Sequence, residues 1–134
     1  MSLSLVLLIV SLYFVLFSTV PCTAAVGMEN RLIKDAQITA SSEWDSNHAA
    51  IQARLNVKEG GGKQGGWSAR YNDANQWIQV ALGSYTKLTG IATQGRNGGR
   101  HRQWVTNYQL EYSDDGVNFN YYKEPGQSSP KVKP

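Results

Sequence analysis

Residues 77–83 read Trp77-Ile78-Gln79-Val80-Ala81-Leu82-Gly83 and form a clear strand pattern. Ile78, Val80 and Leu82 recur at every second position, which is the period of a half-buried antiparallel strand. Gln79 and Ala81 then face away from the core. Because a strand of this kind buries only one face, it needs a second layer to cover it, so this stretch predicts a packed β-protein.

A second strand pattern follows at residues 105–113, where Val105, Tyr108, Leu110 and Tyr112 are the candidates for burial. The alternation is regular from Tyr108 onward. The turn residues Asp114-Asp115-Gly116 come next and tolerate the positive φ that a tight reversal requires. We therefore expect residues 108–113 and 117–122 to form a hairpin, in which the aspartate pair serves the turn and not a metal ion.

Helical signals are weak by comparison. Residues 47–56 contain reasonable helix formers but no strong apolar stripe, so we expect a turn or two of helix there. The glycines between residues 60 and 66 indicate a loop. The chain is predicted to be all-β, and a β-sandwich of jelly-roll type is the simplest architecture for strands that bury one face each.

Several separate motifs, in this order, closely resemble the discoidin family, also called the coagulation factor V/VIII type C domain. They are Gly27-Met28-Glu29-Asn30, Ile38-Thr39-Ala40-Ser41-Ser42, Ala53-Arg54-Leu55-Asn56, Gly66-Trp67-Ser68-Ala69-Arg70, residues 77–83, Gly90-Ile91-Ala92-Thr93-Gln94-Gly95-Arg96, Trp104-Val105-Thr106-Asn107-Tyr108 and Tyr112-Ser113-Asp114-Asp115-Gly116. The resemblance covers residues 26–122 and implies a discoidin-type jelly-roll β-sandwich.

The C-terminal segment 123–134 departs from the family. It is rich in Pro, Gly, Ser and Lys and is expected to be disordered. The sequence pattern of this segment does not match the family's closing strands. The domain is therefore predicted to be incomplete at the C-terminus, with exposed strand edges. The chain would then be a fragment, a splice product or an incomplete gene product.

The N-terminal segment has a different character. Leu3 to Val20 is apolar apart from three serines and a threonine, and no charged residue precedes Glu29. With the small residues that follow Pro21, this predicts a signal peptide over residues 1–24 and a secreted, extracellular protein. The alternative is a retained membrane anchor, because about 18 apolar residues is the lower limit for spanning a bilayer.

The single cysteine, Cys22, allows two interpretations. The resemblance implies a cysteine just before the Gly-Met-Glu motif, paired with another at the end of the domain, and Cys22 occupies the first position. The chain has no second cysteine. Cys22 is therefore either lost with the signal peptide or a free thiol in the mature protein.

Composition excludes several function classes. The net charge of +3 weakly favours anionic partners, and the chain has no run of like charges that would predict nucleic-acid binding. The two histidines lie in loop-like segments, and no nucleophile elbow or metal-binding His pair is present. We therefore expect no enzyme activity, no catalytic residue, no metal site and no cofactor.

Binding residues are expected in loops, which the resemblance places at residues 42–49, 58–65 and 96–103. Loops on a rigid sheet scaffold are the usual place for recognition. In the first loop, Trp44 lies between Glu43 and Asp45, so its indole is either exposed for a ligand or packed over the base of the loop. We predict that Trp44, Asp45 and His48 contribute to ligand binding.

The loop 96–103 is the basic focus of the chain and adds Arg96, Arg100, His101 and Arg102 to the predicted ligand-binding residues. Arginine pairs with carboxylate, sulfate or phosphate through a planar fork of donors. Arg96 follows Thr93-Gln94-Gly95, as a ligand-contacting arginine does in the collagen-binding receptors of the family. The alternative is a solvated loop that only aids solubility. The other tryptophans, Trp67, Trp77 and Trp104, are expected to be scaffold.

These observations predict an extracellular module for cell adhesion or matrix recognition. Its expected partners are a glycan or a matrix protein, with an anionic phospholipid surface as a further possibility. Lipid insertion is the weaker expectation, because residues 59–64 offer no large apolar side chain, unlike the loop tips of phospholipid-binding members of the family. The alternative function is a truncated structural component of the matrix that binds no ligand by itself.

Overall fold

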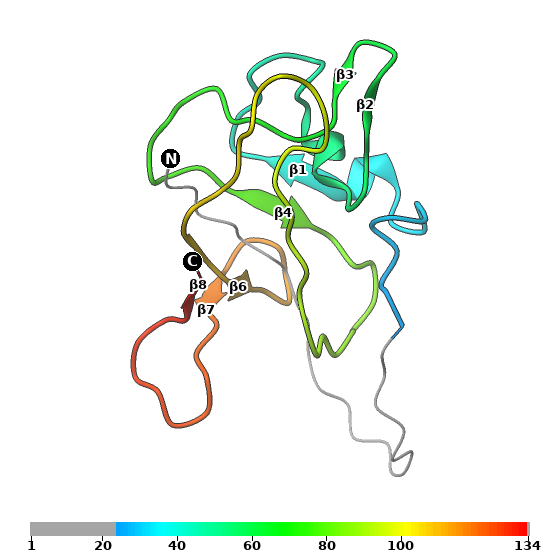
Figure 1. Cartoon of the computed structure of the whole chain (residues 1–134). Coiled ribbons are helices and arrows are strands. Elements are labelled where there is room, and N and C mark those ends of the chain that lie inside the picture. Colours follow the sequence, from blue (N-terminus) through cyan, green and yellow to red (C-terminus); the bar gives the residue numbers. More distant parts are fainter. Residues whose placement is uncertain (1–23, 134) are drawn as a thin grey trace.

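The computed structural model describes residues 24–133, and the signal peptide predicted for residues 1–24 and Cys22 lie almost wholly outside this range. The described residues form short strands joined by long loops (Figure 1). Two single turns of 3-10 helix, η1 (Asp35–Gln37) and η2 (Ala50–Ala53), are the only helices in this part of the chain. The second lies within the weak helical segment 47–56, as expected. The all-β prediction agrees with this secondary structure.

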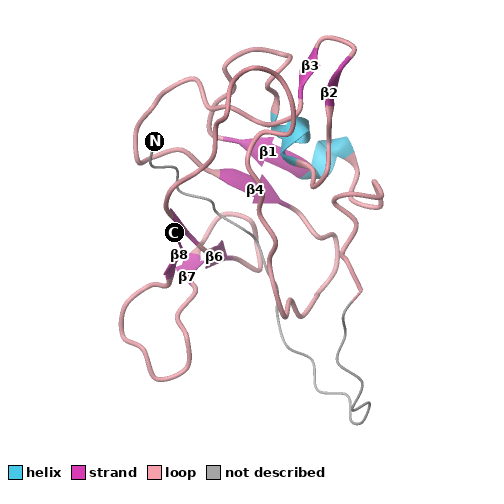
Figure 2. Ribbon diagram, viewed as in Figure 1, coloured by secondary structure: helices cyan, strands magenta, loops and turns pink. Residues whose placement is uncertain are grey.

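All strand pairs are antiparallel, and they form four two-stranded sheets among the described residues. The pairs are β1 (Ile38–Ala40) with β4 (Ile78–Val80), β2 (Glu59–Gly60) with β3 (Lys63–Gln64), β5 (Tyr108–Gln109) with β8 (Val132–Lys133), and β6 (Glu111–Tyr112) with β7 (Asn120–Tyr121). Figure 2 shows that loops make up most of the remaining chain.

The core lies around β1 and β4. Ile38 faces Val80 and Ala40 faces Ile78 across the pair, and Ile33 and Ala50 complete the buried cluster. Ile78 and Val80 are buried while Gln79 between them is half-buried, which agrees with the predicted alternation. Because the ends of β1 and β4 are also joined by mutual hydrogen bonds between Gln37 and Ala81, the pair forms the rigid centre of the domain.

The predicted hairpin is present in a shorter form, with β6 and β7 joined through the turn that Asp115 stabilises. One carboxylate oxygen of Asp115 accepts hydrogen bonds from the backbone N–H groups of Val117 and Asn118, both at 2.8 Å, and Gly116 adopts a φ of +73°. The burial prediction is wrong for Tyr112 and Val105, which are 40% and 37% exposed. Only Leu110 of that set is buried, and Tyr108 is half-buried.

The C-terminal segment differs from the disordered tail that we expected after residue 122. Residues 132–133 form β8 and pair with β5, and the backbone N–H of Lys131 donates to the carbonyl oxygen of Tyr122 at 3.0 Å. The Pro- and Gly-rich composition produces a turn at residues 125–126 that returns the chain to the sheet. The incompleteness of the domain stays a prediction.

Candidate functional site

Three loops gather at one end of the domain, and one of them contains the β2–β3 hairpin (Figure 1). We call residues 42–49 loop 1, residues 58–65 loop 2 and residues 96–103 loop 3. Loop 1 is anchored at its base by the buried Gln76, whose side-chain oxygen accepts hydrogen bonds from the hydroxyls of Ser41 and Ser42. These contacts fix the point at which the chain leaves β1.

Within loop 1, the neighbouring side chains of Glu43 and Trp44 have different roles, because the first bonds to the protein and the second is exposed. The Glu43 carboxylate accepts a hydrogen bond from the backbone N–H of Ala50 at 2.6 Å and so stabilises the start of η2. The next side chain, Trp44, is 62% exposed, while its backbone N–H donates to the carbonyl of Ser68 at 2.8 Å. The structure therefore agrees with the exposed alternative for Trp44 and not with an indole packed over the loop base.

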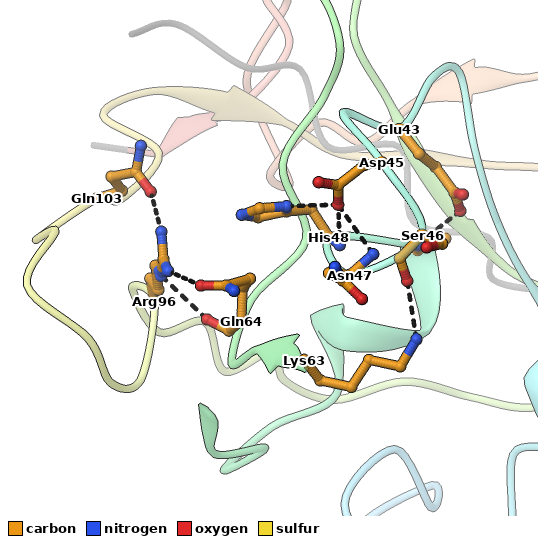
Figure 3. Close-up of polar contacts among 10 residues, drawn as sticks. Glu43, Asp45, Ser46, Asn47, His48, Lys63, Gln64, Arg96 and Gln103 are labelled. Carbon is orange, nitrogen blue, oxygen red and sulfur yellow. Dashed lines mark hydrogen bonds and ion pairs between the residues drawn. The ribbon is translucent and has the colours of Figure 1, made fainter. Parts of the chain in front are cut away.

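Asp45 organises the other half of loop 1. Its carboxylate accepts hydrogen bonds from the backbone N–H groups of Asn47 and His48 and lies 2.7 Å from Nδ1 of the His48 ring (Figure 3). The hydrogen bond from the His48 side chain is the main cause that lowers the pKa of Asp45, and backbone donors add to it. Asp45 thus orients His48, and only His48 of the two lines the cavity described below.

Arg96 joins loop 3 to loop 2. Its Nε donates to the backbone carbonyl of Gln64 at 3.0 Å, one terminal nitrogen donates to the Gln64 side-chain oxygen, and the other donates to the Gln103 side-chain oxygen at 2.9 Å (Figure 3). Two backbone hydrogen bonds between the loops, Glu59 to Asn97 and Asn97 to Gly65, support the same junction. Arg96 therefore uses three of its five N–H donors inside the protein.

Loop 2 also contacts loop 1. The Lys63 ammonium donates to the carbonyl of Ser46 at 2.9 Å (Figure 3). The backbone N–H of Gln64 donates to the carbonyl of Asn47 at 3.1 Å. The β2–β3 hairpin thus lies between the other two loops and is bonded to both. The three loops form one connected surface and not three independent segments.

An open cavity of about 270 Å³ lies on this surface. It brings together four of the seven predicted binding residues, Trp44, His48, Arg96 and His101. The other lining residues are Ser68, Ala69, Arg70, Asn72 and Gln103. The lining has two guanidinium groups, two imidazoles, an indole and two amides, and no carboxylate. These groups suit a polar or anionic ligand with a flat face that can stack on the indole.

Three of the predicted binding residues lie outside the cavity lining. Arg100 and Arg102 are exposed on loop 3, and Asp45 acts through His48. Sequence analysis did not predict Arg70, Asn72 or Gln103 as binding residues. A weak signal was available for Arg70, because it is the last residue of the motif that contains Trp67. Its position beside loop 1 comes from the hydrogen bond that its backbone N–H donates to the Ser42 hydroxyl.

The scaffold assignment holds for Trp67, whose indole N–H donates to the carbonyl of Ser42 at 2.9 Å and whose ring packs on the core. It is wrong for Trp104, which is 61% exposed. Trp104 follows loop 3 in a segment that forms no strand. Trp44 and Trp104 are therefore equally exposed, but only Trp44 lines the cavity.

Residues 24–133 contain neither a cluster of metal-binding side chains nor a membrane-spanning helix. This part of the chain holds no group of three or more His, Cys, Asp or Glu side chains placed to bind a metal ion. It also has no helix with the length and apolar character needed to cross a membrane. The recognisable surface feature of this end of the domain is the cavity between the loops.

An antiparallel β-scaffold that presents connected polar loops and an exposed tryptophan at one end defines a class of protein, the loop-based binding module. Comparison with known proteins gives the family. The F5/8 type C domain matches residues 37–133, which is most of the chain, so this protein belongs to the F5/8 type C (discoidin) domain family. Family membership implies a β-sandwich, and the matched domain is of a kind that binds ligands and does not catalyse reactions.

Similar proteins include lactadherin from Rattus norvegicus, which is 40% identical over 110 residues, or 80% of this chain and 26% of that protein. The EGF-like repeat and discoidin I-like domain-containing protein 3 of Homo sapiens is 38% identical over 117 residues, covering 83% of this chain and 24% of that protein. Coagulation factor V from Sus scrofa is 36% identical over 115 residues, covering 83% of this chain and 5% of that protein. The chain thus spans about a quarter or less of these relatives.

Proposed function

We propose that this chain is a secreted, extracellular recognition module for cell adhesion or matrix binding, and that its ligand is a glycan or a matrix protein held by loops 1 to 3. The observation that carries the proposal is the cavity that Trp44, His48, Arg96 and His101 line together, although they come from two separate loops. Convergence of polar and aromatic groups in a concave site is typical of ligand binding. Arg100 and Arg102 are proposed to add positive charge at its rim.

Rigidity of the three loops supports this function. Hydrogen bonds of 2.9 to 3.1 Å connect the loops. The side chains of Lys63 and Arg96 donate to backbone carbonyl oxygens, and the backbone N–H of Gln64 donates to another. A site whose loops are already fixed loses less conformational entropy on binding. The cavity is therefore suited to direct recognition without a preceding rearrangement of the loops.

An anionic phospholipid surface is the less favoured ligand. The tip of loop 2 is Gly60-Gly61-Gly62, which offers no apolar side chain for insertion, and seven of the nine residues that line the cavity are polar or charged. A membrane ligand would depend on the exposed indoles of Trp44 and Trp104. Secretion itself follows from the proposed signal peptide over residues 1–24.

The test compares Trp44→Ala with Trp104→Ala, because the two indoles are 62% and 61% exposed and only the first lines the cavity. Both variants and the unmodified protein are applied to immobilised glycans, to collagen and to phosphatidylserine vesicles. We expect Trp44→Ala to lose glycan or matrix binding while Trp104→Ala retains it. Equal loss in both variants, or binding to vesicles alone, would contradict the proposed function.

A second candidate function is structural and is favoured by one observation. Tyr112, Val117 and Tyr121, in and beside the β6–β7 hairpin, are 40%, 76% and 48% exposed. Such side chains beside short strands suit association with another chain. Sedimentation analysis distinguishes the two functions, because the structural candidate requires self-association that Val117→Lys and Tyr121→Lys weaken, whereas the binding module requires none.

A further inference from the structure

We infer that the cavity binds a single acidic sugar residue, whose carboxylate lies between the guanidinium groups of Arg70 and Arg96 while its ring stacks on Trp44. The inference rests on the proposed function and names the class of ligand for the same site. It adds Arg70 as the residue that determines specificity for an acidic over a neutral sugar.

Arg70 is the cation in the cavity with the most unused donors. Its backbone N–H is held by the Ser42 hydroxyl at 3.0 Å, which fixes the start of the side chain beside loop 1. Its guanidinium has no hydrogen bond or ion pair with another residue in the described part of the chain, and the side chain is exposed. An unpaired guanidinium in a concave site is a ready partner for a carboxylate, which it can bind through two parallel hydrogen bonds.

Arg96 supplies a second cation whose position is fixed in advance. Three of its N–H groups are bonded to Gln64 and Gln103, so the guanidinium plane is held in place. Two N–H groups then remain without a partner among residues 24–133 and can complete the coordination of the same carboxylate. The paired arginines therefore combine one adaptable donor group with one rigid donor group.

The acidic side chains near the cavity are already satisfied elsewhere. Asp45 is bonded to His48 and to two backbone N–H groups, Glu43 to the backbone of Ala50, and Asp73 to Asn75 and Gln76. None of these carboxylates lines the cavity. The Glu59 carboxylate lies near a terminal nitrogen of Arg96, since both atoms approach Gly99, but no carboxylate lines the cavity beside Arg70. Arg70 is therefore the arginine whose charge is left for a ligand.

The size and the remaining lining favour one sugar residue. A cavity of about 270 Å³ is smaller than the sites that enclose drug-sized ligands. Trp44 offers a flat apolar face, and the amides of Asn72 and Gln103 can exchange hydrogen bonds with hydroxyl groups. A lipid chain would need an apolar wall, but only Trp44 and Ala69 in the lining are apolar.

The experiment measures binding of the full chain to galacturonate and galactose, and to glucuronate and glucose, by NMR titration at constant ionic strength. Within each pair, only the acid carries a charged group, and the rest of the ring is the same. We expect each acid to bind at least about tenfold more tightly than its neutral partner, as expected for a charge-assisted hydrogen-bonded pair. Arg70→Gln should remove this preference, whereas Arg31→Gln, at an exposed arginine outside the three loops and outside the cavity, should retain it.

Three outcomes would overturn the inference: no detectable binding of either acid, equal affinity for acid and neutral sugar, or the same loss in Arg70→Gln and Arg31→Gln. A phosphatidylserine vesicle arm tests the lipid alternative, and vesicle binding that depends on Arg70 without acid-sugar binding would also contradict it. If glycan or matrix binding persists and still requires Trp44, the proposed function survives while the acidic-sugar inference fails. Thermal unfolding of both variants checks that their folds are intact.

Discussion

The Arg96 guanidinium lies 3.0 Å from the backbone carbonyl oxygen of Gln64, 32 residues earlier in the chain, and also bonds the side chain of Gln64. Sequence analysis predicted Arg96 as a residue that contacts ligand through a bidentate fork. In the structure most of that fork joins loop 3 to loop 2. We therefore expect Arg96 to act both as a cation in the cavity and as the residue that holds the loops together.

Replacement of Arg96 by lysine tests this double role. Lysine keeps the charge but has one donor nitrogen in place of three, so it cannot bond Gln64 and Gln103 together. Arg96→Lys should lower both ligand affinity and the midpoint of thermal unfolding. Arg100→Lys, on the exposed part of the same loop, should change neither by a measurable amount. A variant with unchanged stability and lower affinity would assign Arg96 to ligand contact alone.

Gly65 allows the close approach of loops 2 and 3. It adopts a φ of +67°, and an added Cβ would overlap the carbonyl oxygen of Asn97 and lie 2.9 Å from the backbone nitrogen of Glu59. Gly61 has a similar φ of +58° with open space around it. Gly61→Ala should therefore cost about 1 kcal/mol of backbone strain only.

Gly65→Ala carries the same strain plus the overlap with loop 3. We expect a larger loss of stability than for Gly61→Ala, together with weaker ligand binding, because loop 3 has to move. Urea denaturation gives the free energies of unfolding of both variants. Equal values for the two alanines would show that loops 2 and 3 separate without cost.

Arg54 is a buried arginine that connects the N-terminal segment to η2. It is 3% exposed, donates to the carbonyl oxygens of Met28 and Ile33 at 3.0 and 2.8 Å, and forms a 2.5 Å ion pair with Asp35. Arg54→Met should destabilise the fold by about 3 kcal/mol, at the lower end for breaking a buried pair because Asp35 is half exposed.

Arg31→Gln is the matched control, because Arg31 lies 4.0 Å from the same Asp35 but is itself exposed. An exposed ion pair of this kind contributes less than about 1 kcal/mol. Urea denaturation again provides the measurement. If both substitutions cost the same, the carbonyl contacts of Arg54 contribute nothing to the fold.

Asp115 should make the β6–β7 turn sensitive to acid. Hydrogen bonds from the backbone and then the side chain of Asn118, followed by those from Val117 and Ser113, hold the pKa of Asp115 well below its usual range. Since the folded-state pKa is lowered, the stabilisation is complete above the unfolded value of about 3.9 and is lost as the pH falls below it.

The measurement compares thermal unfolding of the unmodified chain and Asp115→Asn across pH. The unmodified chain should be the more stable of the two near neutral pH, and the difference should start to shrink near pH 4 and continue to shrink below pH 3. A difference that stays constant over this range would show that the charge of Asp115 does not stabilise the turn.

The sequence pattern predicted the features that depend on nearby residues. The two-residue period identified the buried Ile78 and Val80, and the residue types at Asp115 and Gly116 identified the turn. Features that depend on distant contacts were missed. Arg70 enters the cavity because its backbone bonds Ser42, and β8 pairs with β5 across more than 20 residues, against a composition that suggests disorder.

The binding loops show the same limit. The acidic neighbours of Trp44 left its exposure or packing open, and the structure shows it 62% exposed. Trp104, beside a strand pattern, was expected to be scaffold and is 61% exposed. Local sequence does not reveal whether a second layer covers a strand. The role of Arg96 was likewise hidden, because its partner Gln64 lies on another loop.

The most direct test of the central claim, that the cavity between the loops is the ligand-binding surface, uses the indole N–H signals of the protein. The chain has four tryptophans, so each gives a separate signal in a nitrogen-15 NMR spectrum. The titrant is the ligand that the unmodified chain binds best among immobilised glycans, collagen and vesicles. We expect the Trp44 signal to move, with those of Trp104 and Trp77 unchanged. Movement of Trp104 with no change at Trp44 would contradict the claim.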